Sequence, residues 1–127
     1  MKKDISKAKY VDGFLLIVPK KKLKEYTKMA KIASKVWLDL GAIQYCETVS
    51  DDFKVLAGIG FDKLTKIKKS EMVIFSWITY PSKSVRNKVN KLAMNDPRLS
   101  MFADPKMQMP FDVKRMSYGG FKMLLNS

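Results

Sequence analysis

Histidine is absent from this chain of 127 residues, and cysteine occurs once, at Cys46. The absence of imidazole excludes His-ligated haem, His-ligated zinc and a Ser-His-Asp triad. A single cysteine cannot form an intramolecular disulfide, which excludes a disulfide-rich secreted scaffold. Because no histidine is available to activate its thiol, Cys46 is expected to be a small buried hydrophobic residue rather than a nucleophile.

Long hydrophobic runs are also missing. The longest covers residues 14–18, far short of the roughly 20 residues of a membrane-spanning helix. The basic residues after Met1 are not followed by the apolar core of a signal peptide. Carboxylates and thiols show no metal-ligand spacing, and residues 58–60 lack the Gly-Lys-Ser/Thr of a phosphate loop. We therefore expect a cytoplasmic protein with no membrane, metal or cofactor.

Acidic residues are few, because 12 Asp and Glu face 25 Lys and Arg, for a formal net charge of +13. Lysines crowd the segment 20–35, and a second basic cluster follows at residues 83–91. Such an excess suits either a polyanion such as RNA or solvated helix faces. Most of these residues are Lys rather than Arg, the usual side chain of specific nucleic-acid recognition. We therefore expect solvated helix faces and no nucleic-acid binding.

The composition that is present, 46% hydrophobic and 29% charged, is that of a globular protein. Residues 1–127 are expected to form a single domain, with residues 1–8 frayed. Residues 9–18 favour a strand. Apolar residues then recur at helical spacing from Leu23 to Leu40, and Gly41 is a helix stop.

The second half of the chain repeats this order. Residues 42–50 and 72–80 are rich in β-branched and aromatic residues and predict strands, whereas residues 51–71 predict only a connection with a short helix. Ser82 or Ser84 is expected to cap a second long helix that ends near Asn95. Residues 103–113 predict a loop. Residues 114–125 predict the last strand, with a bulge or close backbone approach at its two glycines, 119 and 120.

The resulting order, β-α-β-β-α-β, predicts an α+β, ferredoxin-like fold. It has a four-stranded antiparallel sheet with two helices on one face. The first and third strands are apolar on both faces rather than alternating. The face without helices would expose an apolar patch of about 500 Å². A second copy stacked sheet to sheet is the simplest cover, so a homodimer is expected.

Several segments resemble a YbaA-like bacterial family of unknown function, over residues 9–125. They are YVDGF at 10–14, KVW at 35–37 followed by GA at 41–42, FSWI at 75–78, DPRL at 96–99 and MPFD, KRM and YGGFK at 109–122. The resemblance implies a dimeric α/β barrel, in which two ferredoxin-like sheets face each other. That superfamily includes cofactor-free monooxygenases, isomerases and haem-degrading enzymes. The family brings no established active-site residues.

The candidate site residues come from polar groups inside apolar segments. Asp12 lies inside an apolar strand, and Arg115 or Lys114 is its expected partner. With Tyr118, Asp12 and Arg115 are the candidate catalytic residues. Glu47 is a similar carboxylate nearer the end of its strand. The expected ligand-binding residues are aromatic: Tyr10, Tyr45, Trp77 and Phe111.

The function expected from these residues is binding of a small, largely apolar molecule in a cleft between sheet and helices, roofed by residues 97–113. The sequence does not decide whether catalysis occurs. One alternative is a cofactor-independent monooxygenase or isomerase. Another is RNA binding through the basic helix faces, since the RNA-recognition motif shares this topology. The third strand, EMVIFSWITY, lacks the glycine and the basic residue of that motif.

Overall fold

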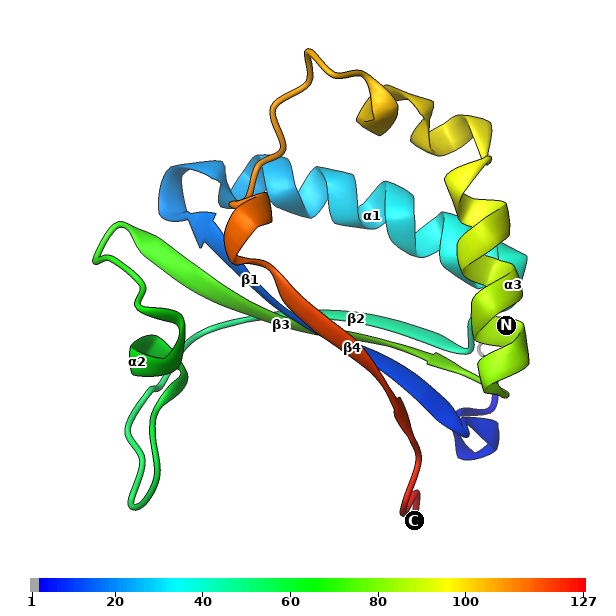
Figure 1. Ribbon diagram of the computed structural model, residues 1–127, viewed down its shortest axis with the longest axis horizontal. Coiled ribbons are helices and arrows are strands. Elements are labelled where there is room, and N and C mark those ends of the chain that lie inside the picture. The colour runs from blue at the N-terminus through cyan, green and yellow to red at the C-terminus, as the bar shows by residue number, and fades with distance from the viewer. Residues whose placement is uncertain (1–2) are drawn as a thin grey trace.

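The computed structural model describes residues 3–127 and has a four-stranded antiparallel sheet with helices (Figure 1). The strands are β1 (Tyr10–Pro19), β2 (Gln44–Val49), β3 (Glu71–Tyr80) and β4 (Ser117–Lys122), in the spatial order β2-β3-β1-β4. This is the α+β arrangement that the sequence predicts. The short helix α2 (Phe61–Thr65) lies in the connection before β3.

Two long helices, α1 (Leu23–Leu40) and α3 (Lys83–Met94), cover one face of the sheet (Figure 1). As expected, α1 stops at Gly41, whose φ of 134° lies in the region that only glycine adopts readily. A Cβ there would also press on Val89 of α3, at 3.3 Å from its Cγ2. The Oγ of Ser82 caps α3 by accepting the Val85 N–H at 3.1 Å.

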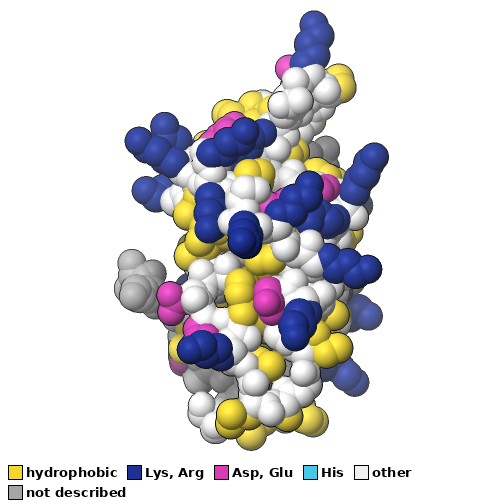
Figure 2. Space-filling model, turned by 90° about the vertical axis from the view of Figure 1, so that its left-hand side faces the viewer, with side chains coloured by type: hydrophobic (Ala, Val, Ile, Leu, Met, Phe, Trp, Pro, Cys, Tyr) yellow, Lys and Arg dark blue, Asp and Glu magenta, His cyan; other side chains and the backbone are white. Residues whose placement is uncertain are grey.

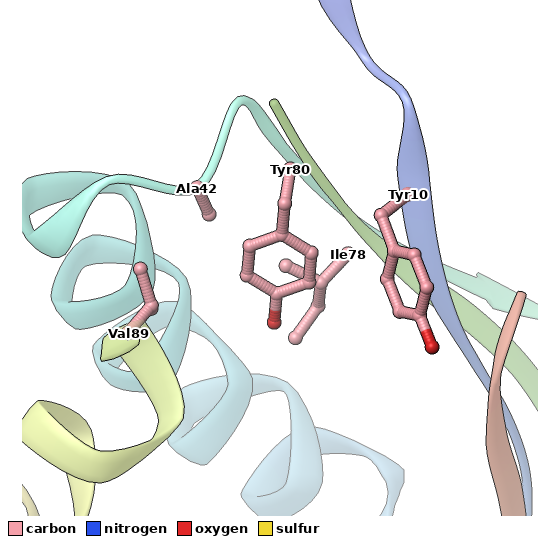
Figure 3. Close-up of a cluster of buried hydrophobic side chains, with 5 residues drawn as sticks. All are labelled: Tyr10, Ala42, Ile78, Tyr80 and Val89. Carbon is pink, nitrogen blue, oxygen red and sulfur yellow. The ribbon is translucent and has the colours of Figure 1, made fainter. Parts of the chain in front are cut away.

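The core between the helices and the sheet consists of two adjoining clusters. Figure 3 shows the first, in which Tyr80 of β3 lies among Ala42, Val89, Ile78 and Tyr10. In the second cluster, the helix-facing side chains of β1 and β3 pack against α1. Its buried members are Leu16, Val18, Tyr26, Ala30 and Ile74. Successive side chains of a strand point to opposite faces, and those that point toward the helices form this core.

The opposite face of the sheet is apolar as well, and we call it the open face. Its residues are the odd-numbered ones of β1 and β3 and their neighbours in β2 and β4. Ile17 and Val73 are 1% and 3% exposed, at the end where α2 and its connection lie. Beyond that end, Phe75 and Phe121 are 47% and 59% exposed. The chain itself covers only part of this face.

Two boundaries differ from the sequence-based expectation. The sequence suggests a frayed segment at residues 1–8, whereas residues 5–7 form the 3₁₀ turn η1 (Ile5–Lys7) and Ala8 is buried. Residues 1–2 lie outside the described residues. The last strand starts at Ser117 rather than at residue 114, because Asp112 caps the turn η4 (Val113–Arg115) by accepting the Lys114 N–H.

The glycines of β4 form no bulge, since the register between β1 and β4 is continuous from Tyr10 to Leu15. Gly120 is instead the close approach that the sequence offered as the alternative. A Cβ at Gly120 would overlap the Tyr10 hydroxyl and the Arg86 guanidinium. The missing side chain lets α3 and the end of β1 approach this edge of the sheet.

Candidate functional site

A cavity of about 340 Å³ lies between the sheet and the helices. Its floor comes from β1, β2 and β3, and its walls come from α1 and α3. Its roof is the segment 97–113, which begins with the 3₁₀ helix η3 (Pro97–Ala103). Almost every lining side chain is apolar, including Leu99, Phe102, Met109 and Phe111 of the roof. The roof predicted from the sequence is therefore present, and Phe111 lines the cavity beneath it.

Glu47 is the one ionisable carboxylate among the residues that line this cavity. It projects from β2 on the helix-facing side, opposite Ser76 of β3. Tyr26 of α1 donates its hydroxyl to Oε1 at 2.7 Å, and Tyr45 donates its hydroxyl to Oε2 at 2.9 Å. The cavity thus contains one polar cluster in an apolar surround, which we call the Glu47 cluster (Glu47, Tyr26, Tyr45 and Ser76).

Burial sets the protonation behaviour of this cluster. Removal from water raises the pKa of Glu47 above its ordinary value, and the hydrogen bonds from Tyr26, Tyr45 and Ser76 offset only part of this rise. Burial and the neighbouring carboxylate raise the pKa of Tyr26 and of Tyr45 far above that of a free phenol. Both phenols therefore remain protonated donors, and Glu47 is the group of the cluster that takes up or releases a proton.

The hydrogen-bond capacity of Glu47 is not exhausted by the two tyrosines. Each carboxylate oxygen accepts two hydrogen bonds, and each here takes one phenol. The ionised carboxylate can accept a further hydrogen bond from a molecule in the cavity, and the protonated form can donate one. A carboxyl group of raised pKa beside an apolar molecule also suits general acid–base work.

Replacing Glu47 with glutamine is expected to flatten the pH dependence of stability. A carboxyl group with a raised pKa in the folded state favours folding most when it is protonated. Its contribution is full below the ordinary glutamate pKa of about 4.3 and is lost as the pH rises through the folded-state value. The free energy of unfolding of the unaltered protein, from urea titrations, should therefore fall relative to that of Glu47→Gln as the pH rises from 4 toward 8.

Glu25 on the exposed side of α1 offers the matched control. Glu25→Gln removes one carboxylate from an exposed position, so it shows the effect of the same loss of charge outside the cavity. Parallel curves for the parent and Glu47→Gln would contradict the raised pKa.

Two of the predicted catalytic residues, Asp12 and Tyr118, line one smaller cavity, whereas Arg115 lies outside it in η4. Asp12 is buried on the helix-facing side, and its partner is Arg86 of α3, with Nε 3.5 Å from Oδ1. The expectation that Arg115 or Lys114 pairs with Asp12 is wrong. Asp12 lies opposite Gly120, whereas Arg115 precedes β4 in η4. Arg115 binds Glu71 and also Asp112, whose Oδ2 is 2.8 Å from its Nε.

The predicted aromatic residues are divided between the two faces of the sheet. Tyr45 belongs to the Glu47 cluster, whereas Tyr10 accepts a hydrogen bond from Nη2 of Arg86 at 2.8 Å. Tyr118 stacks on Phe14, with 5.7 Å between ring centroids. Trp77 lies on the open face beside Phe75. The structure therefore brings together Tyr45 and Phe111 of the four predicted ligand-binding residues, but neither Tyr10 nor Trp77 lines this cavity.

Sequence reasoning ranked Glu47 below Asp12, although the strand contained the signal. Tyr45 and Glu47 are two residues apart, so they share one face of β2. The contribution of Tyr26 could not be found in this way, because it depends on how α1 packs over β2. Within residues 3–127, no cluster of three or more Cys, Asp or Glu side chains is arranged to hold a metal ion. The described helices include none that is long and apolar enough to cross a membrane.

The fold is similar to that of a solved protein of unknown function from Agrobacterium tumefaciens, described as a NIPSNAP family protein. The TM-score is 0.52 at 14% sequence identity, over 96% of this chain and 93% of that one. At this identity the likeness concerns the fold alone.

Sequence relatives are much closer. The uncharacterised protein YbaA of Escherichia coli K12 is 41% identical over 118 residues, which cover 93% of this chain and 98% of that protein. YbaA of Shigella flexneri matches to the same extent. The model of a protein family of unknown function, DUF1428, matches residues 9–113. The chain, with a half-buried glutamate lining a roofed apolar cavity, therefore belongs to the DUF1428 family of proteins of unknown function.

Proposed function

We propose that this protein binds a small, largely apolar molecule in the cavity between sheet and helices, and that Glu47 holds the polar group of that molecule. The observation that carries the proposal is one hydrogen-bonded carboxylate in a cavity whose other lining is almost entirely apolar. Such a combination of apolar walls and a few placed polar groups is typical of small-molecule sites.

The hydrogen bonds of the cluster favour a ligand that carries a hydroxyl group. Tyr26 and Tyr45 already donate to Glu47, so the carboxylate has room for a donor rather than for another acceptor. A cofactor-independent isomerase or monooxygenase is the enzymatic form of this proposal. In the isomerase form, Glu47 would accept a proton from one carbon of the bound molecule and return it to another.

Filling the cavity tests the proposal. Trp37 lines the cavity and reports binding through its emission, once Trp77 on the open face is replaced by phenylalanine. We expect 1-decanol to change this emission in a saturable way. Ala33→Phe places a ring in the cavity and should weaken decanol binding at least tenfold, about 1.4 kcal/mol.

Ala57→Phe, at an exposed position in the connection before α2, is the matched control and should not alter the affinity. A Trp77→Phe protein whose emission is indifferent to decanol would refute the proposal. Equal weakening by both phenylalanine variants would show that the probe binds elsewhere, which refutes it as well.

A second copy of the chain is the proposed cover of the open face. Between Val73 and Thr79 and across the strands paired with them, this face carries no charged residue. Two patches of about 500 Å² each reach the lower end of the area that specific interfaces bury. An isologous sheet-to-sheet homodimer removes both from water at once.

RNA is the competing partner, because Lys24, Lys28, Lys31 and Lys35 form an exposed stripe along α1. Between Val73 and Thr79 the open face offers aromatic rings but no positive charge for phosphate contacts. On the side of the molecule that Figure 2 shows, Lys and Arg are scattered among hydrophobic and acidic groups. Filter binding to mixed-sequence RNA separates RNA binding from the homodimer proposal. If RNA is the partner, the filter should retain RNA at low salt, and the retained amount should fall as the salt concentration rises.

A further inference from the structure

A second, smaller cavity adjoins the one described above. Its volume is about 270 Å³, and its polar lining comes from Asp12 of β1, from Arg86 and Asn90 of α3 and from Tyr118 of β4. Phe14, Trp37 and Met94 line both cavities, so the two share a wall. Met94 is largely exposed and unbranched, so its side chain can turn aside without disturbing the core.

The polar groups of this second cavity keep unused hydrogen-bond capacity. Among residues 3–127, no acceptor takes the buried Nε–H of Arg86, because Asp12 lies 3.5 Å away, beyond good hydrogen-bond length. The Oδ1 of Asn90 accepts from Trp37 Nε1 at 3.0 Å and from the Tyr80 hydroxyl at 3.4 Å. These two donors fix the amide, and its NH₂ group is the part that they leave unengaged.

This arrangement is held in place by the surrounding structure. The side chain of Asp12 is only 9% exposed, so its position is set by packing. Gly120, directly opposite Asp12, provides the space in which Arg86 meets Tyr10. Besides its long ion-pair contact with Arg86, the Asp12 carboxylate has the Tyr80 hydroxyl as a neighbour. A buried carboxylate with oxygen lone pairs to spare and two adjacent donors is suited to a group that both donates and accepts, such as a hydroxyl.

The sheet register fixes how far this cluster lies from Glu47. Asp12 is opposite Ile78, and Glu47 is opposite Ser76, so both project toward the helices from strands on either side of β3. Two strand spacings and two residues of rise place their Cα atoms about 12 Å apart. The two polar clusters therefore lie in neighbouring cavities, on either side of the wall that Phe14, Trp37 and Met94 form.

We propose that Asp12, Arg86 and Asn90 form a second polar subsite of the same cleft, and that the ligand is an elongated apolar molecule with a hydroxyl group at each end. This inference rests on the proposed function, since the first hydroxyl is the one that Glu47 holds. The hydroxyl at the second subsite donates to Asp12 and accepts from Asn90 or from Nε of Arg86.

The test compares 1,10-decanediol with 1-decanol, using the emission of Trp37 in the Trp77→Phe protein. The measured quantity is the ratio of the two affinities. Asp12→Asn should lower the preference for the diol about fivefold, because an amide replaces a charged acceptor at the end that only the diol occupies. Glu47→Gln should weaken both probes alike and leave the ratio unchanged. An exposed matched control, Asp52→Asn, should leave the ratio unchanged.

The outcomes separate this inference from the proposed function. If decanol binds but Asp12→Asn does not change the ratio, the second subsite is wrong and the binding cavity stands. If neither probe binds, both proposals fail. If Asp12→Asn does not fold, the Trp77→Phe protein is tested with 1,4-butanediol and 1-butanol instead. The four-carbon diol is too short to reach both subsites at once. A preference for this diol over 1-butanol as large as that of the ten-carbon pair would therefore overturn the inference.

Discussion

Tyr80→Ala is expected to lower the free energy of unfolding by about 3–5 kcal/mol, the range found when a large aromatic residue is deleted from a packed core. Tyr80 is fully buried and packs against Val89, Ala42 and Ile78, where α1, α3 and β3 meet (Figure 3). Its ring also supports Asn90, to which its hydroxyl donates at 3.4 Å. Urea titration followed by circular dichroism measures the loss.

Two further variants divide this loss into its parts. Tyr80→Phe removes only the hydroxyl and should cost about 0.5–1.5 kcal/mol. Tyr118→Ala deletes an exposed tyrosine and should cost less than the core deletion by several fold, since little apolar area leaves a packed environment. If Tyr80→Ala and Tyr118→Ala were equally mild, the core would not be centred on Tyr80.

Phe75→Lys is expected to convert the proposed homodimer into monomers, with the dissociation constant raised at least a hundredfold. Phe75 lies near the middle of the open face, between Phe61 of α2 and Trp77. A lysine there would bring an unpaired charge into an uncharged interface, where the cost of desolvation is several kcal/mol. Light scattering at micromolar concentration reports the mass of the particle.

Met101→Lys is the matched control, because Met101 is about as exposed as Phe75 but lies in η3, on the helix side of the sheet. This variant should remain dimeric. A parent protein that is already a stable monomer at micromolar concentration would remove the homodimer from the proposal. The ligand cavity would survive that result, since all its lining residues come from one chain.

The fold was predictable where one local rule decided the structure. The 3-and-4 spacing of apolar residues identified α1, and Gly41 and Ser82 marked helix boundaries because a positive φ and an unpaired N–H favour those residue types. The continuous apolar pattern of β1 and β3 predicted that both sheet faces are apolar. The start of β4 was misplaced because residues 113–115 have no pattern that separates a 3₁₀ turn from a strand.

The candidate site was only partly predictable, because its geometry depends on contacts between distant segments. Tyr45, Phe111 and the roof followed from local sequence, and Asp12 was identified as an unusual buried carboxylate. Its partner Arg86 lies on a helix at the far side of the sheet–helix interface, and no periodicity relates the two. The hydrogen bond between Tyr26 and Glu47 was unpredictable for the same reason, because it depends on how α1 crosses β2.

The position of β1 in the sheet has a consequence for folding during synthesis on the ribosome. This strand is made first, yet it is central in the sheet: Tyr10 pairs with Tyr80 on one side and with Lys122 on the other. These hydrogen-bonding partners of Tyr10 lie 70 and 112 residues further along the chain (80 − 10 and 122 − 10). A nascent chain therefore exposes an apolar strand without its pairing partners until β3 and β4 have been made. Such long-range pairing slows folding and leaves time for aggregation.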